Sequence, residues 1–573
     1  MHSSRRRFLK SSVAGASIAV FPAHANAIAT GVEFSLPVAM NLSAANDYSP
    51  GFPFKNLLWG ARPWLTRNVN DLTGWDSEQQ ASLKLDREGY PLQVPFVGAD
   101  GSQHDVFTIL PNTCRPGRYV LLYDGQGKIE SGGRTQIVKS NRGRVELQMM
   151  HARGDENLEI LRILKSDAAD PIHNMRMIPI ELEHADLDAE PFLDEVVEYC
   201  KQFHALRFMD WLETNDSINR DWAARKTTRF FTQCGVTGDV VGLTDDPVPQ
   251  WQRQYASGVA LELCIDLANA TKCDAWLCVP HLADDDYIFQ MAVLVKERLD
   301  PDLKVYVEYS NEVWNWQFQQ AHWNLHSAAI GNLLAATPIA SWQPSRSPKL
   351  NQHGVAVNRV GINFPERMGI ATRRILAIWE RVFAGRDRNR LVRVAAGQAS
   401  WQEVSARCLN TVVRNGGCDA FTVSGYFAAD DAIYRRWEKL GADLTAAQVI
   451  EEMKEVIASE SARQIKSVSQ MCQRGQVDFV VYEGGQHLQP RDQQATSYMP
   501  ALKAAQFDRG MAQCYRELLR LHAGANCRLF TAYASVGEQG SRYGSWGHLE
   551  RYTQAVTEMP KMQALVESNA KKR

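Results

Sequence analysis

The chain has 573 residues, of which 45% are hydrophobic and 22% charged, and its formal net charge is −2. This length provides a large buried core and exceeds one ordinary domain. The nearly balanced charge gives no basic surface of the kind that nucleic acids require, so we expect no nucleic-acid partner. The eleven cysteines lack the paired spacing of zinc or redox sites, so we expect no metal and no cofactor.

The first residues have the order of a twin-arginine export signal. Arg5, Arg6 and Arg7 precede a charge-free apolar run at 13–21, and small residues follow at 25–27. We therefore expect residues 1–27 to be a signal peptide and the product to be periplasmic or secreted. No later apolar stretch reaches the roughly 20 residues that cross a bilayer, so we expect no membrane span.

From about residue 200, short β-branched or aromatic runs alternate with amphipathic stretches, which is typical of repeated βα units. The pattern predicts seven strands, at residues 205–210, 274–280, 304–309, 391–396, 419–426, 478–483 and 527–533, and an eighth at 33–42. It also predicts helices, at residues 255–267, 288–299, 511–519 and 554–566. Eight such units predict an α/β fold, a (β/α)8 TIM barrel.

A long interruption separates the first predicted strand from the second. Its runs of β-forming residues, such as 119–123 and 144–149, are divided by glycine turns, which predicts an inserted small antiparallel β domain; a long irregular loop is the alternative. The expected organisation is a signal peptide at 1–27, the first barrel strand and helix at 28–71, the β-rich module at 72–179 and the remaining barrel at 180–573. Residues 328–363 are expected to form a loop.

Two carboxylates end predicted barrel strands. Glu312 follows the strand at 304–309, and Glu483 ends the strand at 478–483 before two glycines. The carboxyl ends of barrel strands meet in one mouth, where active sites form. Because buried carboxylates are costly, two of them aimed into one mouth indicate a chemical role. Retaining glycosidases use such a pair at a separation of roughly 5–5.5 Å.

The sequence here resembles clan A of the glycoside hydrolases, the superfamily of many cellulases, mannanases and xylanases. Asn311-Glu312 resembles the clan's Asn-Glu at strand four, and Glu483 resembles its nucleophile at strand seven. Further matching positions are Arg207, His281, Glu308, Tyr426 and Trp546. The chain departs from the clan at two points: Ser424 stands where the clan often has His, and Trp314 stands near a frequent Pro.

The resemblance implies roles for these residues. Glu312 is expected to be the acid/base, with a raised pKa, and Glu483 the nucleophile, kept ionised by Arg207 and Tyr426. Asn311 is expected to bind a substrate hydroxyl. Trp211, Trp314, Trp316 and Trp546 are the candidates for stacking on sugars, and His281 is a further supporting residue.

Two other interpretations remain open from the sequence. One is a non-catalytic polysaccharide-binding protein of the cell envelope on the same barrel. The other is an exported metalloenzyme that uses His281, Asp284 and Asp286, although three acids at this place are typical of a helix N-terminus. The expected partner is a polysaccharide or oligosaccharide, whether the protein is a glycoside hydrolase or a non-catalytic binding protein. The glycan, its linkage and the oligomeric state stay open.

Overall fold

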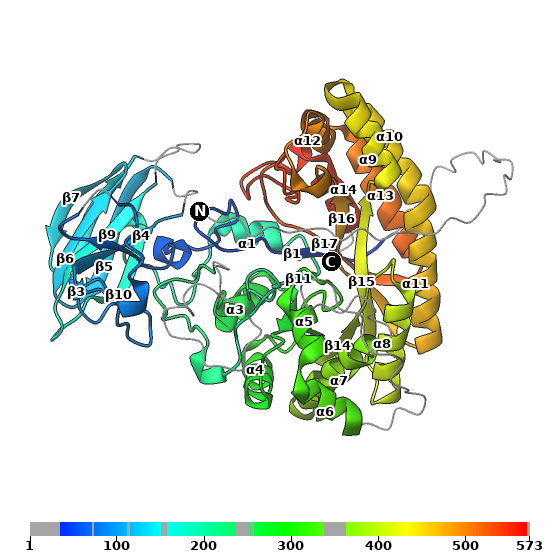
Figure 1. Ribbon diagram of the computed structural model, residues 1–573, viewed down its shortest axis with the longest axis horizontal. Helices are drawn as coiled ribbons and strands as arrows, with labels where there is room; N and C mark the ends of the chain where they lie inside the picture. The colour runs from blue at the N-terminus through cyan, green and yellow to red at the C-terminus, as the bar shows by residue number, and fades with distance from the viewer. Residues whose placement is uncertain are drawn as a thin grey trace.

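The computed structural model describes residues 35–71, 74–111, 115–150, 158–235, 253, 257–336 and 363–569. Eight parallel strands close into a barrel in the order β1-β11-β12-β13-β14-β15-β16-β17 (Figure 1). Their bounds are β1 Val38–Asn41, β11 Ala205–Arg207, β12 Asp274–Val279, β13 Val305–Tyr309, β14 Leu391–Ala396, β15 Ala420–Ala428, β16 Asp478–His487 and β17 Cys527–Ala532. The predicted (β/α)8 barrel with an additional β domain is therefore confirmed.

The barrel interior is built in layers, because alternate residues of a strand point to the same side. An apolar cluster separate from the main core takes residues from the strands: Ala39, Ala205, Trp276, Val394, Ala420, Val480, Tyr482 and Leu529, with Tyr306 and Val392 packed against it. Two residues further along the strands, the next layer contains buried polar groups: Asn41, Arg207, Glu308, Thr422 and Thr531. The interior thus changes from apolar to polar toward the carboxyl ends.

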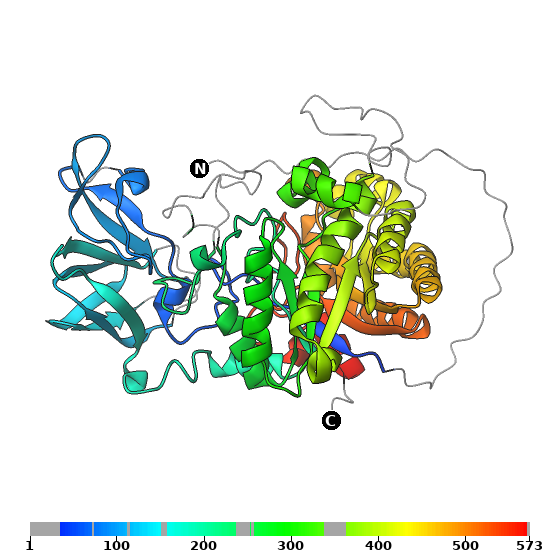
Figure 2. The ribbon, with the colours of Figure 1, turned by 90° about the horizontal axis from the view of Figure 1, so that it is seen from below.

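Helices cover the outside of the barrel (Figures 1 and 2). Their bounds are α1 Asp194–Cys200, α3 Leu261–Thr271, α4 Asp285–Arg298, α5 Gln319–His326, α6 Ala328–Ala336, α7 Phe364–Val382, α8 Gln402–Arg414, α9 Asp431–Leu440, α10 Ala446–Val456, α11 Ala462–Gly475, α12 Met499–Phe507, α13 Arg509–Gly524 and α14 Pro560–Asn569. Among the described residues, no helix is long and apolar enough to cross a membrane.

Two local expectations about helices were wrong. The segment expected to begin a loop at residue 328 is helical as α6, because its small and apolar residues favour a helix; residues 337–362 of that predicted loop lie outside the described part. The helix expected from residue 255 begins only at Leu261. Asp284 accepts a hydrogen bond from the Tyr287 amide, so the acidic start of α4 is an N-cap.

The β domain stands beside the barrel, at the left of Figure 1. It consists of two antiparallel sheets, ordered β10-β5-β8-β7 and β2-β4-β9-β6. The strands are β2 Leu65–Asn68, β3 Phe96–Val97, β4 Gln103–Ile109, β5 Gly117–Asp124, β6 Gly127–Gly132, β7 Thr135–Asn141, β8 Arg144–Met149, β9 Ile160–Ser166 and β10 His173–Pro179. Strand β2 starts at Leu65, seven residues before the expected start of the module.

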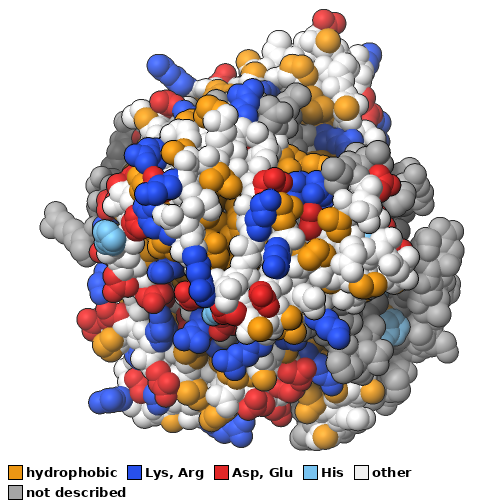
Figure 3. Space-filling model, turned by 90° about the vertical axis from the view of Figure 1, so that its left-hand side faces the viewer, with side chains coloured by type: hydrophobic (Ala, Val, Ile, Leu, Met, Phe, Trp, Pro, Cys, Tyr) orange, Lys and Arg blue, Asp and Glu red, His pale blue; other side chains and the backbone are white. Residues whose placement is uncertain are grey.

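The outer face of the β domain carries basic and acidic side chains intermixed, with hydrophobic side chains between them (Figure 3). Exposed hydrophobic residues here include Trp75, Val97 and Val138. Side chains of the inner faces, such as Leu121 and Leu147, belong to the same continuous core as the barrel helices. The β domain therefore packs on the barrel and is no isolated appendage.

Candidate active site

Glu483 is aimed into the barrel by an irregularity in β16. On the neighbouring strand β15, Val423 pairs with Val481 but Ser424 already pairs with Glu483, so Tyr482 is an extra residue on β16. A β-bulge of this kind re-aims side chains, and bulges are frequent next to active sites. Tyr482 lies in the interior cluster together with Val480, two residues before it, and the bulge makes the adjacent Glu483 face inward as well, buried to 6% exposure.

Glu312 reaches the same mouth from the turn that follows β13. Both Ser310 (φ 52°) and Glu312 (φ 42°) adopt left-handed backbone conformations, which are uncommon for residues other than glycine and cluster at functional sites. Asn315 holds the turn by donating its amide N–H to the Glu312 carbonyl at 2.7 Å and its Nδ2 to Glu312 Oε2 at 2.8 Å. The turn is thus fixed around the carboxylate.

The carboxyl groups of Glu312 and Glu483 are neighbours in the same mouth, close enough for each to shift the pKa of the other. Burial raises the pKa of Glu312. Burial and the charge of Glu312 together raise the pKa of Glu483 well above its usual range. Two neighbouring buried carboxyl groups cannot both be ionised easily, so we expect the pair to keep one proton at neutral pH and to titrate as a unit.

Arg207 connects the pair to the rest of the polar layer. Its guanidinium contacts Glu483 Oε2 at 3.4 Å and donates to Glu308 Oε2 at 2.8 Å, while the rings of Trp276 and Tyr482 lie 5.7 and 5.1 Å from its centre. All of the side chain is buried. Arg207 lowers the pKa of Glu483, but burial and the charge of Glu312 outweigh this effect, so the pKa of Glu483 is raised although an ionised Glu483 was expected.

Asn311 lies beneath the pair, and its amide is already engaged. Its Oδ1 accepts from Arg207 Nη2 at 2.9 Å, and its Nδ2 donates to Asn215 Oδ1 at 3.0 Å. An amide nitrogen has two protons, so one N–H of Asn311 is available for the expected substrate hydroxyl. The side chain is 2% exposed, which holds its orientation.

Sequence reasoning missed two residues of the site. Tyr482 donates its hydroxyl to Glu312 Oε1 at 2.9 Å, and Asn41 accepts from Arg207 at 3.1 Å while its Nδ2 donates to the Tyr482 carbonyl at 2.9 Å. Asn41 ends the first barrel strand, a position that the period-2 pattern could have indicated. Tyr482 alternates with Val480, which faces the same interior cluster, but Glu483 directly after it drew attention away, because only the bulge turns that second residue inward.

Aromatic residues form a wall at one side of the mouth. Tyr426 and Trp546 lie 5.9 Å apart in a T-shaped contact, and His487 lies 4.8 Å from Trp546. Tyr533, which directly follows β17, lies 5.7 Å from Trp546. The charge of Glu483 contributes, after burial, to raising the pKa of Tyr426. The structure thus brings Tyr426 and Trp546 together near Glu483 and adds His487 and Tyr533, which the sequence did not single out.

The other tryptophans differ among themselves. Trp211 is 1% exposed, packs between Phe54 and Phe192, and donates its N–H to the Ser43 carbonyl. It is a core residue, so the expectation that it stacks on sugar was wrong. Trp314 is half-buried against the core, and its indole N–H has no hydrogen-bond partner among the described residues. Trp316 packs against Phe364, with ring centroids 4.8 Å apart.

His281 is buried just after β12, with its ring 6.2 Å from Trp323 on α5. Asp284 is used as the α4 cap. Among the residues that the structure describes, no group of three or more His, Cys, Asp or Glu side chains is arranged to hold a metal ion. Nothing in this part of the chain therefore supports the metalloenzyme interpretation.

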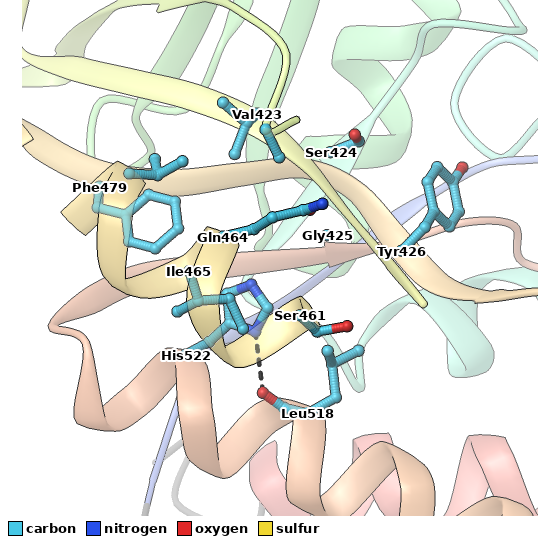
Figure 4. Close-up of a pocket in the computed structure, with 12 residues that line it drawn as sticks. Val423, Ser424, Gly425, Tyr426, Ser461, Gln464, Ile465, Phe479, Leu518 and His522 are labelled. Carbon is cyan, nitrogen blue, oxygen red and sulfur yellow. Dashed lines mark hydrogen bonds between the residues drawn. The ribbon is translucent and has the colours of Figure 1, made fainter. Parts of the chain in front are cut away.

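A small pocket lies behind the barrel wall, on the outer side of β15 and β16 (Figure 4). Its lining is mostly apolar, and the Gln464 amide points toward Gly425. His522 is held there by its hydrogen bond to the Leu518 carbonyl, and burial lowers its pKa to about 4. The lining contains no carboxylate. We therefore place the active site at the barrel mouth and not in this pocket.

No family model matches the chain, and no curated protein matches it. Similar solved structures exist, and they are glycoside hydrolases. A broad-specificity endoglucanase from Clostridium longisporum is 8% identical, with 66% of this chain and 86% of that chain covered and a TM-score of 0.34. A family 5 glycoside hydrolase from Prevotella bryantii is 10% identical, with coverages of 66% and 86% and a TM-score of 0.31.

A 4-O-α-L-rhamnosyl-β-D-glucuronidase from Fusarium oxysporum is 9% identical, with 66% of this chain and 63% of that chain covered and a TM-score of 0.37. These proteins are of the kind that the sequence resembles. At such identities and TM-scores the likeness carries nothing about the substrate or mechanism of this chain. Both have to be inferred from its own residues.

Proposed function

We propose that this protein is a retaining glycoside hydrolase that acts on a β-linked polysaccharide or oligosaccharide, with Glu312 as acid/base and Glu483 as nucleophile. One observation carries the proposal: two buried carboxyl groups lie as neighbours at the carboxyl end of a closed barrel, with Arg207 in contact with Glu483 and Tyr482 and Asn315 donating to Glu312. This is the arrangement that double displacement at an anomeric carbon requires.

The proximity of the two carboxyl groups favours retention over inversion. An inverting enzyme places a water between its carboxyl groups, which then lie roughly 6.5–9.5 Å apart. Each of Glu312 and Glu483 shifts the pKa of the other, and this close approach supports the shorter separation of a retaining enzyme. The β linkage follows from the resemblance to clan A and is part of the proposal.

In the first step Glu312 donates its proton to the leaving glycosidic oxygen while a Glu483 oxygen attacks the anomeric carbon, which gives a glycosyl ester of Glu483 and a free alcohol. In the second step Glu312 takes a proton from water, the water oxygen attacks the anomeric carbon, and the carboxylate of Glu483 leaves. When Glu483 forms the ester its charge disappears, so Glu312 no longer faces a like charge and its pKa falls, as the change from acid to base requires.

The polar layer supports both steps. Arg207 stabilises the carboxylate of Glu483 as it is released, and the Tyr482 hydroxyl and Asn315 amide orient the two oxygens of Glu312. The remaining N–H of Asn311 is directed to a sugar hydroxyl. Trp546 and Tyr426 offer aromatic surface to the sugar face.

The test separates the two carboxylates by chemistry. We expect Glu483→Ala to lower kcat/KM for every substrate by on the order of 10³-fold or more, because the ester cannot form. Glu312→Ala removes only proton transfer, so an aryl glycoside with a good leaving group still glycosylates Glu483 and releases the aryl alcohol in a burst. Azide then restores turnover and gives the β-glycosyl azide. A screen of aryl glycosides and polysaccharides supplies the substrate.

Azide rescue of Glu483→Ala that gives the retained β-glycosyl azide would exchange the two roles, because loss of the nucleophile itself leads to the inverted α-glycosyl azide. Hydrolysis unaffected by either change would remove both residues from the mechanism. A wild-type protein that binds polysaccharides in the same screen but hydrolyses none would instead be the non-catalytic binding protein. Asp284→Ala is a matched control, because it removes a carboxylate that caps α4 and is expected to leave kcat unchanged.

We also propose export through a twin-arginine signal to the periplasm or the outside. The observation behind it is the arginine, apolar and small-residue order of residues 1–27, which lie outside the described residues. Intact-mass measurement of the protein from a periplasmic fraction checks the proposal. A mass that still includes residues 1–27 in exported protein would contradict the cleavage site.

A further inference from the structure

Lys561, the second residue of α14, buries its ammonium group completely. The ammonium donates to Gln506 Oε1 at 3.0 Å, Gln539 Oε1 at 2.9 Å and the Ser545 carbonyl at 2.7 Å. Its three protons thus have three acceptors, and all three acceptors are neutral. Burying a cation without a contacting carboxylate is costly, and burial lowers the pKa of Lys561 well below its usual range. Such a costly arrangement indicates a specific task.

Two of the three acceptors belong to a loop at the active site. Gln539 and Ser545 lie between β17 and α14, in the segment that carries Trp546. Gln539 also donates to the Gly547 carbonyl at 3.0 Å, and the Ala534 amide donates to the Trp546 carbonyl at 2.9 Å. Hydrogen bonds therefore hold three successive carbonyl groups, those of Ser545, Trp546 and Gly547. Lys561 donates directly to the Ser545 carbonyl, and it also donates to Gln539, whose amide holds the Gly547 carbonyl.

The same network reaches the strand of the nucleophile. Gln486, three residues after Glu483 on β16, donates its Nε2 to the Ser545 carbonyl at 2.7 Å. Lys561 and Gln486 thus converge on one oxygen, from α14 and from the barrel wall. Gln506 comes from α12, which packs beside α14 (Figure 1). The carbonyl before Trp546 is fixed relative to both Glu483 and the outer helices.

We propose that Lys561 is a positioning residue: its buried ammonium fixes the 540–547 loop so that the Trp546 indole stands beside the catalytic carboxylates as a platform for the sugar. This rests on the proposed function, in which Trp546 contacts substrate. Only a group with three donors satisfies three oxygens that converge on one point. An apolar side chain of similar length leaves the two glutamine oxygens without Lys561 and the Ser545 carbonyl with Gln486 alone. The loop then relaxes, and Trp546 leaves its place.

The experiment is a double-mutant cycle of Lys561→Met and Trp546→Ala, measured on the substrate that the wild type hydrolyses. We expect each change to raise KM roughly tenfold with a smaller effect on kcat, because the platform binds sugar and the carboxylates stay in place. If Lys561 acts through Trp546, the double variant behaves like Trp546→Ala alone. Additive effects, or an unchanged KM in Lys561→Met, would overturn the proposal.

Lys296→Met is the matched control. This lysine also donates to a backbone carbonyl, that of Val382, at 2.8 Å, but it lies on α4 outside the site, so KM is expected to stay unchanged. If Lys561→Met does not fold, Gln539→Ala removes the bond to Gly547 in the same network and takes its place in the cycle.

A second readout does not depend on activity. Hydrogen exchange of the backbone amides in the peptide 540–548 is expected to accelerate in Lys561→Met and to stay unchanged in Lys296→Met. Unchanged exchange in Lys561→Met refutes the positioning role even if the protein hydrolyses no glycoside. If exchange is faster in Lys561→Met but the wild type hydrolyses no glycoside, the proposed function is refuted and the positioning role stays intact.

Discussion

The β domain and the barrel both bury carboxylates, but they treat them differently. Glu159 of the β domain, 2% exposed, accepts the Arg134 amide N–H at 3.1 Å on each oxygen and the Thr135 hydroxyl at 2.5 Å. Arg134 lies in the turn between β6 and β7, and Thr135 is the first residue of β7. Glu483 of the barrel is similarly buried, yet its closest cation is 3.4 Å away and it faces a second carboxyl group.

The difference teaches which polar burial stabilises a fold and which serves chemistry. Donors surround Glu159, so its ionised form is satisfied locally and the turn is held in place. Burial and the neighbouring Glu312 carboxyl group raise the pKa of Glu483. A structural role needs no such arrangement. Proteins commonly give up stability at such sites, and the barrel mouth follows this rule.

The largest effect that tests this comparison is expected from replacing Glu159, the structural carboxylate. We expect Glu159→Ala to destabilise the protein by about 1–3 kcal/mol, because buried donors of the turn lose their acceptor. The kcat is expected to stay unchanged, since the turn lies in the other domain. Urea unfolding and steady-state kinetics measure the two effects. Glu130→Ala, which removes an exposed carboxylate paired with Arg162 at 3.1 Å, is the control and is expected to cost about 0–1 kcal/mol.

A Glu159→Ala variant that loses hydrolysis at unchanged stability would mean that the β domain contributes to the reaction. The division between a structural and a chemical carboxylate would then be wrong.

The sequence predicted the barrel well because parallel strands are buried on both faces and appear as apolar runs. The strand at 391–396 has the predicted bounds, and the others differ by a few residues at their ends. Glu312 and Glu483 could be placed at one mouth because strand ends converge in this fold. The roles of Arg207 and Tyr482 could not be predicted as fully, because they depend on hydrogen-bond register.

Register describes how two strands are aligned with each other, so the sequence of one strand alone does not determine it. The bulge at Tyr482 follows from how β16 pairs with β15 and β17. The same holds for Lys561, whose three acceptors come from α12 and from the loop that precedes α14. Trp211 was misjudged for a related reason: whether a tryptophan faces a cleft or the core depends on what packs against it.

The smallest effect we expect concerns stability against pH, and it sharpens the comparison between the two carboxylates. In the folded protein the pKa of Glu483 lies well above its usual value of 4.5, because of burial and the Glu312 charge. Between the unfolded and the folded pKa, the folded state therefore binds more protons than the unfolded state. The stability of the wild type must then fall as the pH rises through this window.

Replacing Glu483 by Gln removes this contribution, because an amide has no proton to lose. We expect the Tm of Glu483→Gln to exceed that of the wild type more at pH 8 than at pH 5, and measuring both proteins under the same conditions cancels the titration of all other groups. Glu312→Gln is expected to give the same trend, since we expect the two carboxyls to keep one proton between them. A Tm difference that is independent of pH would mean that both carboxylates titrate normally, and the pair would then have no proton to give to a leaving glycosidic oxygen at neutral pH.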